Sequence, residues 1–460
     1  MDEIREECGV FGIYDNNDGL DVSRMIYLSL YALQHRGQES CGISVANGQI
    51  VRSYKNMGLV SEVFDNNILT SLKGRIGIGH VRYSTTGAST LENCQPISVD
   101  YRDGSMALAH NGNLVNIKTL RKQMGAEGSV FITGNDTELI IKYICKFLVC
   151  SESIQEAIIK TMNVIKGSYA VVLLMQGKLI AFRDPFGIRP LCIGQIKNSY
   201  MISSESCGFS VLGGKFLREV EPGEIIVIDE NGLQSYQAAK EEKSALCVFE
   251  YVYFARPDSN ICNASVHQAR VEAGKQLAIE HPVDADLVIG VPDSALSAAL
   301  GYSLQSGIPF GHGLMRNRYV GRTFIQPTQE MRDAAVRIKF TALANAVEGK
   351  RIIMVDDSIV RGTTTRIIVK MLKDAGAKEV HLRISSPPVK YPCFYGIDIA
   401  TTSQLIASKL STEEICRLVG ADSLGHLSLE GLLRTPVGAK CGLCDACFTG
   451  NYCVDKEDDE

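Results

Sequence analysis

A pair of adjacent acids follows an apolar stretch in the second half of the chain. Residues 352–355 are typical of a buried strand, and Asp356 and Asp357 come directly after them. A Gly-Thr-Thr turn that starts at Gly362 then opens a stretch of helical periodicity. Backbone N–H groups at the start of a helix bind phosphate, and paired carboxylates hold sugar hydroxyls and hard cations such as Mg²⁺. The alternative is a pair of exposed turn acids before a helix that Thr363 caps, although capping needs no paired acids.

This segment resembles the phosphoribosyl pyrophosphate signature of the type I phosphoribosyltransferases, in its apolar strand, its Asp-Asp pair and its Gly-Thr-Thr turn alike. The resemblance implies that Asp356 and Asp357 hold the ribose and a Mg²⁺ ion. It also implies that the following loop cradles the 5-phosphate, through Ser358, Arg361, Gly362, Thr363 and Thr364.

A second strand end carries similar residue types. Residues 287–290 are apolar, and Val291-Pro-Asp-Ser294 follows them and opens a predicted helix. Taken alone, such a segment is equally well explained as an Asp/Ser helix cap. Beside the first loop, we interpret it as a contact for pyrophosphate and metal, with Ser294 as a Mg²⁺ ligand.

Residues 316–327 carry three arginines on a stretch punctuated by glycine and proline. One interpretation is a solvated loop. The other is a mobile lid that supplies positive charge to a departing pyrophosphate and excludes water. Many members of the phosphoribosyltransferase group that this chain resembles have lysine where Arg316 begins the segment, so the charge is kept while the contact geometry differs.

Cys8 lies in a short apolar stretch close to the N-terminus. A buried cysteine in a first strand is normally inert, and Cys8 alone would indicate nothing more. The same half of the chain, however, contains four polar motifs, at residues 33–38, 79–85, 109–113 and 134–138. Together with Cys8 they closely resemble the N-terminal-nucleophile glutamine amidotransferases. That resemblance covers roughly the first half of the chain and implies that Cys8 is the nucleophile.

A thiol nucleophile needs a base, and this half shows no Cys-His-Asp signature of its own. A free α-amine has a reference pKa of about 7.7–8.0, so it can accept a proton near neutrality. The base is then carried by the nucleophile itself, which requires Cys8 to be the first residue of the mature chain. We therefore predict that residues 1–7 form a propeptide.

The same resemblance implies the other residues of a glutamine site. Arg82 would bind the α-carboxylate of glutamine as a bidentate partner, and Asp136 would bind its α-ammonium group. Asn111 and the N–H of Gly112 would form the oxyanion hole. The ammonia released there must escape protonation, which favours an internal passage to a second site.

Both halves together, from Cys8 to Tyr452, resemble the amidophosphoribosyltransferase family. The resemblance implies that glutamine, phosphoribosyl pyrophosphate and water give phosphoribosylamine, pyrophosphate and glutamate, as the opening reaction of purine synthesis. It also implies feedback by purine nucleotides and assembly into a homotetramer. Two rival interpretations are another ammonia-using enzyme, such as a hexosamine synthase, and a non-catalytic sensor of phosphoribosyl pyrophosphate. The Asp-Asp loop argues against the first, and the intact glutamine-site residues argue against the second.

The chain has fifteen cysteines, and Cys441, Cys444 and Cys447 stand three residues apart. This spacing suits an iron–sulfur cluster or zinc in a reducing compartment. Some amidophosphoribosyltransferases carry a [4Fe–4S] cluster, and the resemblance implies that its ligands are Cys247, Cys393, Cys444 and Cys447. Cys441 and Cys453 are then spare. We expect the cluster to tie the C-terminal segment to the second domain, far from the chemistry, and we expect its oxidation to release that segment.

The elements that must position these residues change character along the chain. The first half is β-rich, with predicted hairpins at residues 41–54 and 169–182 and helices at residues 138–148 and 154–165. The second half alternates strand and helix, with strands predicted at residues 287–291, 309–315, 351–355 and 379–384, which indicates a parallel sheet with covering helices. The boundary is expected in the polar residues 235–244. The predicted domains are an αββα glutaminase sandwich at residues 8–235 and an α/β phosphoribosyltransferase domain at residues 245–460, with residues 1–7 as the propeptide.

Composition restricts the class of protein further. The 460 residues include 45% hydrophobic and 22% charged residues, as in ordinary soluble proteins, and the formal net charge is only -5. No basic stripe predicts a nucleic-acid partner, and no apolar run has the length of a membrane span. A secretion signal is also absent from the N-terminal residues, so we expect a cytoplasmic protein with an acidic, solvated tail.

Overall fold

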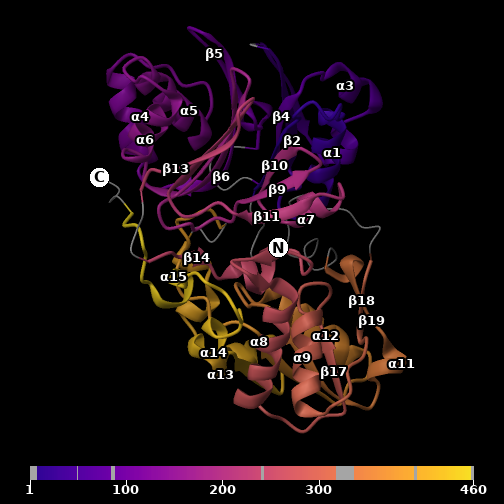
Figure 1. The fold of residues 1–460 in the computed structure, drawn as a ribbon. Helices are drawn as coiled ribbons and strands as arrows, with labels where there is room; N and C mark the ends of the chain where they lie inside the picture. Colours follow the sequence, from indigo (N-terminus) through magenta and orange to yellow (C-terminus); the bar gives the residue numbers. More distant parts are fainter. Residues whose placement is uncertain are drawn as a thin grey trace.

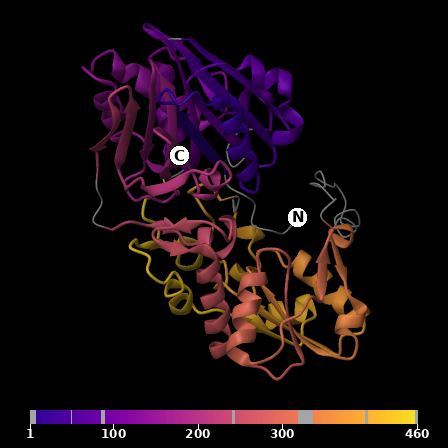
Figure 2. The ribbon, with the colours of Figure 1, turned by 45° about the vertical axis from the view of Figure 1, so that its right-hand side comes forward.

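The computed structural model describes residues 8–48, 50–83, 89–239, 243–317, 336–397 and 401–456. The predicted propeptide and residues 318–327 of the predicted lid lie outside these ranges. The first half of the chain, indigo to magenta in Figure 1, forms one lobe, and the second half, salmon to yellow, forms the other. The 45° rotation of Figure 2 shows the same division into two lobes. Within the described ranges, no helix combines the length and apolar character needed to cross a membrane.

Two antiparallel sheets stack face to face in the first lobe. Their strand orders are β11-β9-β10-β1-β4-β2-β3 and β13-β12-β8-β7-β6-β5. Inward-facing side chains such as Val10 and Ile78 from one sheet, and Val172 and Ile226 from the other, form a shared core. The strands are β1 (Gly9–Tyr14), β2 (Ser40–Asn47), β3 (Ile50–Met57), β4 (Ile76–Arg82), β5 (Ile97–Tyr101), β6 (Gly104–Leu114), β7 (Gly167–Met175), β8 (Lys178–Arg183), β9 (Cys192–Ile196), β10 (Ser199–Ser203), β11 (Lys215–Glu219), β12 (Glu224–Asp229) and β13 (Gly232–Gln237).

Helices cover both outer faces of this sandwich. One group packs on the sheet that contains β1, and its helices are α1 (Val22–Ala32), α2 (Val60–Val63), α3 (Asn66–Ser71) and α7 (Cys207–Ser210). The other group packs on the sheet that contains β6, and its helices are α4 (Ile117–Ala126), α5 (Asp136–Leu148) and α6 (Ile154–Met162). The result is the predicted αββα layering.

A four-stranded parallel sheet forms the centre of the second lobe, in the order β17-β20-β21-β22. Its strands are β17 (Leu287–Gly290), β20 (Arg351–Asp356), β21 (Glu379–Ile384) and β22 (Ser423–His426). Helices α8 (Val266–Glu280) and α9 (Leu296–Ser306) pack against one set of its side chains. Helices α12 (Thr363–Asp374) and α13 (Thr412–Val419) pack against the alternate set, so both faces are covered, as all-parallel sheets require.

Short elements complete the second lobe and join it to the first. They are β14 (Leu246–Cys247), the π-helix η2 (Glu250–Phe254), β15 (Asn260–Ile261), β16 (Ala264–Ser265), β18 (Leu314–Arg316), β19 (Phe340–Ala342), α11 (Ala344–Val347), α14 (Leu429–Leu433), β23 (Leu443–Cys444) and α15 (Ala446–Thr449). Strand β14 pairs in parallel with β23, so the C-terminal segment returns to the start of the second half.

Most predicted elements are confirmed. Strands β2 and β3 form the predicted first hairpin, and β7 and β8 form the second. Helix α5 begins two residues before its predicted start, because Asn135 caps it and accepts a hydrogen bond from the N–H of Thr137. Helix α6 ends at Met162, earlier than the predicted residue 165.

Two predicted boundaries are wrong. Residues 309–315 were expected to form a sheet strand, but Phe310 makes only an isolated bridge to Val288, and β18 starts at Leu314 and pairs with β19. The glycines of this segment explain the difference, because glycine weakens strands. The expected linker at residues 235–244 begins too early, since β13 stays paired with β12 as far as Gln237. Strand β13 lies at the edge of its sheet, and its residues are partly or fully exposed. Its sequence is therefore polar and resembles that of a linker.

Candidate active sites

Cys8 lies immediately before β1 and is buried. Its thiol donates to the carbonyl oxygen of Tyr83 at 3.4 Å, and its own carbonyl oxygen accepts from Nε of Arg36 at 3.1 Å. Burial raises the pKa of the Cys8 thiol to about 11, and the positive charge of Arg82 offsets this only in part. In the chain as translated the thiol is therefore neutral at pH 7, and it needs a base before it can act as a nucleophile.

Arg82 and Asp136, the two residues expected to bind the ends of glutamine, converge on Cys8. Arg82 ends β4 and pairs with Glu39 at 2.8 Å, whereas Asp136 begins α5. Both charges act on the Cys8 thiol, which places all three side chains in one neighbourhood. Two strands and one helix of the sandwich thus bring together residues that lie far apart in sequence.

The carboxylate of Asp136 is held by its own lobe. It accepts from Nδ1 of His110 and from the N–H of Leu114, each at 3.2 Å. Burial alone would raise the pKa of Asp136, but His110 and the backbone N–H groups of Leu114 and Thr137 outweigh it and lower the pKa. Asp136 therefore stays ionised at neutral pH, as a ligand for an ammonium group must be.

Asn111 carries a polar group that is buried without a partner. Its Nδ2 makes no hydrogen bond within the described part of the chain, although the residue is only 2% exposed. Leaving a buried donor unpaired costs about 1–3 kcal/mol, so the arrangement suits a donor reserved for charge that develops during a reaction. The next residue, Gly112, has φ +144°, and a Cβ there would lie 2.1 Å from the carbonyl oxygen of Ser168. Only glycine fits at this position, directly after Asn111.

Replacing Asn111 by alanine is expected to lower the kcat of glutamine hydrolysis by about 10²–10³-fold and to change KM little, because an oxyanion donor acts mainly on the transition state. Steady-state glutamate formation is the measurement. Asn116→Ala is the matched control, since that buried amide already donates to the carbonyl oxygen of Val164 at 2.9 Å. The control should lower the melting temperature and spare kcat. A variant of Asn111 that changed KM alone would argue against the assignment.

The second lobe touches the strand that carries Asn111 and Gly112. Nδ2 of Asn113 donates to the carbonyl oxygen of Phe394 at 2.9 Å, and Oγ of Ser168 donates to that of Tyr395 at 2.7 Å. Nε of Arg189 also donates to the carbonyl oxygen of Tyr395, at 2.9 Å. The backbone after Cys393 is therefore fixed against the candidate oxyanion strand.

The two strand-end loops of the second lobe meet at one edge of the parallel sheet. In the register of β17 and β20, Gly290 lies opposite Val355, so both loops leave the sheet together. Oγ of Ser294 donates to Oδ2 of Asp357 at 2.5 Å, and Oγ of Ser358 donates to Oδ1 at 2.7 Å. Asp356 and Asp357 are each 8% exposed. The sequence prediction that Ser294 belongs with the Asp-Asp pair thus agrees with the geometry.

The start of α12 is arranged as the phosphate prediction requires. Gly362, with φ +79°, occupies the N-cap position, and no side chain caps the helix. The alternative in which Thr363 caps this helix is wrong, because Thr363 is already its first residue. The first-turn N–H groups and the hydroxyls of Thr363 and Thr364 are therefore suited to an anion. Nη2 of Arg361, just before the cap, donates to Oε1 of Gln404.

Arg316 is one of the two lid residues that the structure describes. Its Nη1 lies 3.0 Å from Oδ2 of Asp293 in the loop that also carries Ser294. The start of the predicted lid segment is thereby connected to the predicted pyrophosphate loop, and both partners are partly exposed.

The four cysteines expected to bind a cluster gather at the junction of the lobes. The pairing of β14 with β23 sets Cys247 opposite Cys444, and the carbonyl oxygen of Cys447 accepts from the N–H groups of Lys390 and Tyr391, close to Cys393. Cys393 acts electrostatically on the thiols of Cys247 and Cys447, and Cys247 acts on those of Cys447 and Cys444, so the four thiols lie in one neighbourhood. Within the described ranges no group of three or more His, Cys, Asp or Glu side chains is arranged to hold a metal ion.

The two spare cysteines have different surroundings. Cys441 contacts the thiol of Cys262, which separates it from the four candidate ligands. Cys453 instead contacts the thiol of Cys444. The expectation that the cluster segment lies far from the chemistry is wrong, because Cys393 is two residues from Tyr395, and a Cβ on Gly396 would lie 3.3 Å from the backbone of Gly112.

Sequence reasoning missed several residues of the first site. His110 orients Asp136, and Nε2 of His80 lies 3.1 Å from the carbonyl oxygen of His110. Burial lowers the pKa of His80 to about 3, so its ring is neutral. Both histidines stand inside motifs that were singled out, next to residues with assigned roles, and that position was the available signal. Glu39, the partner of Arg82, stands outside every motif.

A family model described as "Glutamine amidotransferase domain" matches residues 80–210. Curated relatives align over nearly the whole chain. The amidophosphoribosyltransferase of Archaeoglobus fulgidus is 51% identical over 97% of this chain and 98% of its own length. That of Bacillus subtilis is 49% identical over 98% of this chain and 94% of its own.

Solved structures agree with these relatives. The glutamine phosphoribosylpyrophosphate amidotransferase of B. subtilis, in complex with ADP and GMP, superposes with a TM-score of 0.91 at 47% identity, over 98% of both chains. A structure described as the allosteric regulatory enzyme of purine biosynthesis gives a TM-score of 0.92 at 47% identity, over 98% of this chain and 97% of that one. An N-terminal-nucleophile sandwich followed by a phosphoribosyltransferase-type sheet is thus shared along the full length, and the chain belongs to the amidophosphoribosyltransferase family.

Proposed function

We propose that this chain hydrolyses glutamine at Cys8 and transfers the ammonia to C1 of phosphoribosyl pyrophosphate, giving 5-phosphoribosylamine, pyrophosphate and glutamate. The observation that carries the proposal is the similarity to amidophosphoribosyltransferases over 97% of the chain. The proposed domains are a glutaminase domain, predicted at residues 8–235 and ending at Gln237 with β13, and a phosphoribosyltransferase domain at residues 245–460. Residues 1–7 are the proposed propeptide.

In the glutaminase reaction, the sulfur of Cys8 attacks the side-chain carbonyl carbon of glutamine while the freed α-amine of Cys8 takes the thiol proton. Nδ2 of Asn111 and the N–H of Gly112 stabilise the oxyanion, and the C–N bond then breaks while the α-ammonium of Cys8 gives its proton to the leaving nitrogen, which departs as ammonia. Arg82 and Asp136 hold the two charged ends of the amino acid. Water cleaves the thioester and yields glutamate.

In the transferase reaction, ammonia attacks C1 of the sugar and pyrophosphate leaves. The loop after β20 binds the 5-phosphate through Ser358, Arg361, Gly362, Thr363 and Thr364, and Asp356 and Asp357 hold the ribose hydroxyls. Ser294, Asp356 and Asp357 offer hard oxygen ligands that suit Mg²⁺, which usually completes its shell with substrate phosphates and water. When bound, Mg²⁺ neutralises charge on the departing pyrophosphate.

The direct test is glutamate formation by the purified protein with and without phosphoribosyl pyrophosphate, together with pyrophosphate release from phosphoribosyl pyrophosphate and ammonium chloride. We expect glutamate formation to rise when phosphoribosyl pyrophosphate is added, and we expect pyrophosphate release to occur with ammonia alone. Failure of the ammonia reaction would rule out the transferase assignment.

Processing at Cys8 has a pH signature. In the uncleaved chain, the Cys8 thiol has a pKa raised by burial to about 11, so its thiolate fraction at pH 7 is only about 10⁻⁴ and rises about tenfold per pH unit. The rate of alkylation by iodoacetamide should follow that rise up to pH 11. In the cleaved chain, the rate should instead rise through the titration of the α-amine, nearer pH 8. Intact mass separates the two forms, and equal pH profiles for both would contradict the proposed base.

We further propose that the four cysteines hold a [4Fe–4S] cluster. The fit rests on the donor set, which consists of four thiols brought together from β14, β23, α15 and the segment at Cys393. A four-iron cube is larger than one ion, so its ligands stand further apart than those of a mononuclear site. The three-residue spacing of Cys441, Cys444 and Cys447 leaves zinc as the rival occupant of this segment.

Cys444→Ser and Cys441→Ser form a matched pair for this proposal. We expect Cys444→Ser to lose most iron and acid-labile sulfide and the broad visible absorbance of the purified protein, whereas Cys441→Ser should keep them, because Cys441 contacts Cys262 instead. Protein with zinc and without sulfide would identify the rival. Loss of iron in both variants would show that the ligand set is misassigned.

Regulation by purine nucleotides is proposed from one similar structure, and assembly is a separate proposal. Because the B. subtilis structure contains ADP and GMP, we propose that purine nucleotides inhibit this chain, and we propose a homotetramer acting in the cytoplasm. Inhibition by added ADP with GMP, and the mass by light scattering, test the two claims.

A further inference from the structure

A buried network of charged side chains crosses from one lobe to the other beside Cys8. At its centre the guanidinium of Arg36, only 1% exposed, binds Glu250 of the second lobe through two parallel contacts, Nη1–Oε2 at 2.9 Å and Nη2–Oε1 at 2.7 Å. Nη1 also donates to Oε1 of Glu205 in the first lobe at 2.6 Å. Nε of the same arginine donates to the carbonyl oxygen of Cys8 at 3.1 Å. One side chain thus holds the backbone of the nucleophile and a carboxylate from the other lobe.

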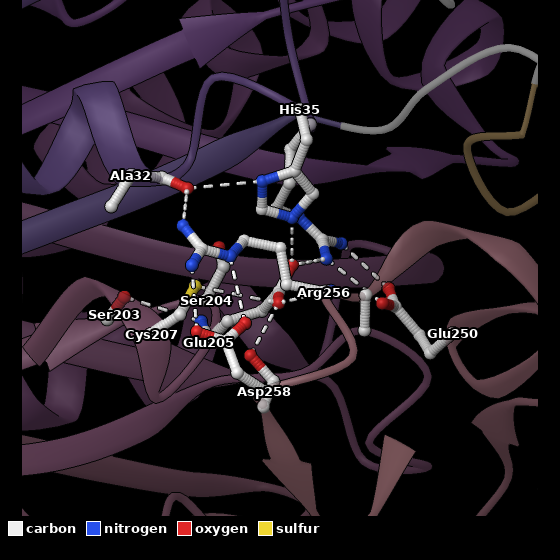
Figure 3. Close-up of polar contacts among 12 residues, drawn as sticks. Ala32, His35, Ser203, Ser204, Glu205, Cys207, Glu250, Arg256 and Asp258 are labelled. Atoms are coloured by element: carbon white, nitrogen blue, oxygen red, sulfur yellow. Dashed lines mark hydrogen bonds and ion pairs between the residues drawn. The ribbon is translucent and has the colours of Figure 1, made fainter. Parts of the chain in front are cut away.

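Glu205 gathers further contacts from both lobes. Figure 3 shows its carboxylate among His35, Cys207, Arg256 and Asp258, with Glu250 on the opposite side of the network. Oε1 lies 2.7 Å from Nε2 of His35, and Oε2 accepts from the N–H of Arg256 at 2.9 Å and from Oγ of Ser259 at 2.7 Å. Glu205 is therefore satisfied without Glu250, and it keeps a negative charge beside Arg36 if Glu250 is changed.

Glu250 is the first residue of the π-helix η2 (Glu250–Phe254), and a second buried arginine holds the other end of that helix. Nε of Arg270 donates to the carbonyl oxygen of Tyr251 at 2.7 Å, and Nη2 donates to that of Ala255 at 2.8 Å. Arg270 lies on α8, and Nδ1 of His267 on the same helix lies 2.9 Å from Oγ of Ser297 on α9, the helix that follows the Ser294 loop. Short π-helices are rare and frequently lie at functional sites.

The electrostatics of this network are costly for a purely structural contact. Burial would lower the pKa of Arg36, but Glu250 and Glu205 outweigh it and raise the pKa. Burial would raise the pKa of Glu205, but His35 and Arg36 outweigh it and lower the pKa. Arg36 and Glu205 are therefore charged at neutral pH inside the protein. A well-packed apolar interface is often as stable as a buried ion network, so stability alone does not account for it.

We propose that Arg36 and Glu250 are positioning residues that couple the two reactions, an inference that rests on the proposed function. Helix α9 follows the Ser294 loop of the proposed transferase site, and the contact of Ser297 with His267 connects α9 to α8, whose Arg270 holds η2. The helix η2 carries Glu250, and Glu250 fixes the arginine that holds the carbonyl group of Cys8. Occupancy of one site is thereby transmitted to the placement of the nucleophile in the other.

Glu250→Gln is the central variant. It keeps the shape and one hydrogen-bond acceptor, and Arg36 keeps Glu205 as a charged partner. We expect pyrophosphate release with ammonia to stay within about twofold of the unchanged protein, and we expect the stimulation of glutaminase activity by phosphoribosyl pyrophosphate to fall by about tenfold, within the usual range of coupling between sites.

Glu224→Gln is the matched control. Glu224 is also a buried carboxylate with a bidentate arginine, since Arg218 contacts both of its oxygens at 2.7 and 2.8 Å, but the pair lies within the first lobe. Its stimulation ratio should be unchanged. Labelling of Cys8 by the glutamine analogue 6-diazo-5-oxo-L-norleucine, with and without phosphoribosyl pyrophosphate, measures the same coupling without turnover. Acceleration of labelling should be lost in Glu250→Gln and kept in Glu224→Gln.

The outcomes separate this inference from the proposed function. If the unchanged protein makes no product from ammonia, the proposed function fails and the inference with it. If the unchanged protein makes product and is stimulated by phosphoribosyl pyrophosphate, full stimulation in Glu250→Gln overturns the inference and leaves the proposed function intact. An equal loss of ammonia-dependent and glutamine-dependent activity in Glu250→Gln would indicate a merely structural role and would also overturn it. The double variant Arg36→Lys with Glu250→Gln should show the same stimulation by phosphoribosyl pyrophosphate as Arg36→Lys alone. Both changes break the same contact, so their effects should not add.

Discussion

Cys8→Ser is expected to abolish glutamine-dependent synthesis of phosphoribosylamine, by about 10⁴-fold or more, while ammonia-dependent synthesis stays within about twofold. Serine nearly preserves the size of the side chain at this buried position, but its hydroxyl is a far weaker nucleophile than a thiolate. The transferase residues lie in the other lobe and need no thioester. Pyrophosphate release with glutamine, and separately with ammonium chloride at high pH, gives both values.

Cys41→Ser is the matched control for this change. Cys41 is buried in β2 of the same sheet, and burial raises the pKa of its thiol as well, but it has no role in the proposed reaction. It should reduce stability and leave the ratio of glutamine-dependent to ammonia-dependent activity unchanged. Loss of both activities in Cys8→Ser, with the protein still folded, would show that the two sites are not separable.

The phosphate loop illustrates what sequence can predict. An apolar run, two acids and a Gly-Thr-Thr turn form one continuous segment, so the strand, the loop and the helix start were all predicted from local residues. The structure adds the contact of Ser294 with Asp357, which spans 63 residues and was expected only because parallel strands end at one edge.

The glutamine site depends more on residues that are distant in sequence. Cys8, Arg82, Asn111 and Asp136 were found because each stands in a motif that resembles a known family, whereas spacing alone would have left Cys8 as an inert core residue. The partners that hold them were not predicted. Glu39 directly follows the motif at residues 33–38 without belonging to it, and the role of His110 in orienting Asp136 depends on how α5 packs on β6.

Contacts between the lobes were the least predictable. Arg36 and Glu250 are 214 residues apart, and although Arg36 stands in the motif at residues 33–38, nothing in that motif points to a partner in the second half of the chain. The same holds for Tyr395, whose carbonyl oxygen accepts from Ser168 at a separation of 227 residues. Hydrophobic period and turn residues specify elements within one domain, but they carry no information on which charged side chains will face each other when two domains meet. The misplaced boundary at β13 has a related cause, because an edge strand exposes polar residues as a linker does.

Asp357→Asn is expected to have the second largest effect, a loss of about 10²-fold or more in both glutamine-dependent and ammonia-dependent synthesis. The change removes one of the two carboxylates proposed to hold ribose and Mg²⁺, and it replaces the acceptor for the hydroxyls of Ser294 and Ser358 with an amide that is half donor. Basal hydrolysis of glutamine, measured without phosphoribosyl pyrophosphate, should persist because Cys8 and its partners lie in the other lobe.

Asp286→Asn provides the comparison at the opposite edge of the same sheet. Asp286 precedes β17, where its carboxylate accepts from the N–H of Arg351 at 2.8 Å and pairs with its guanidinium at 2.7 Å. An exposed pair of this kind contributes little, so both syntheses should stay near the unchanged values. The two variants remove the same charge from the same lobe and differ only in the edge of the sheet. A loss of activity in Asp357→Asn alone therefore locates the transferase reaction at the carboxyl ends of the strands. Equal losses in both variants would instead indicate that either change destabilises the sheet. Together with Cys8→Ser, which spares the ammonia reaction, Asp357→Asn should spare the basal glutaminase, and such reciprocal losses are what two separate sites in one chain require.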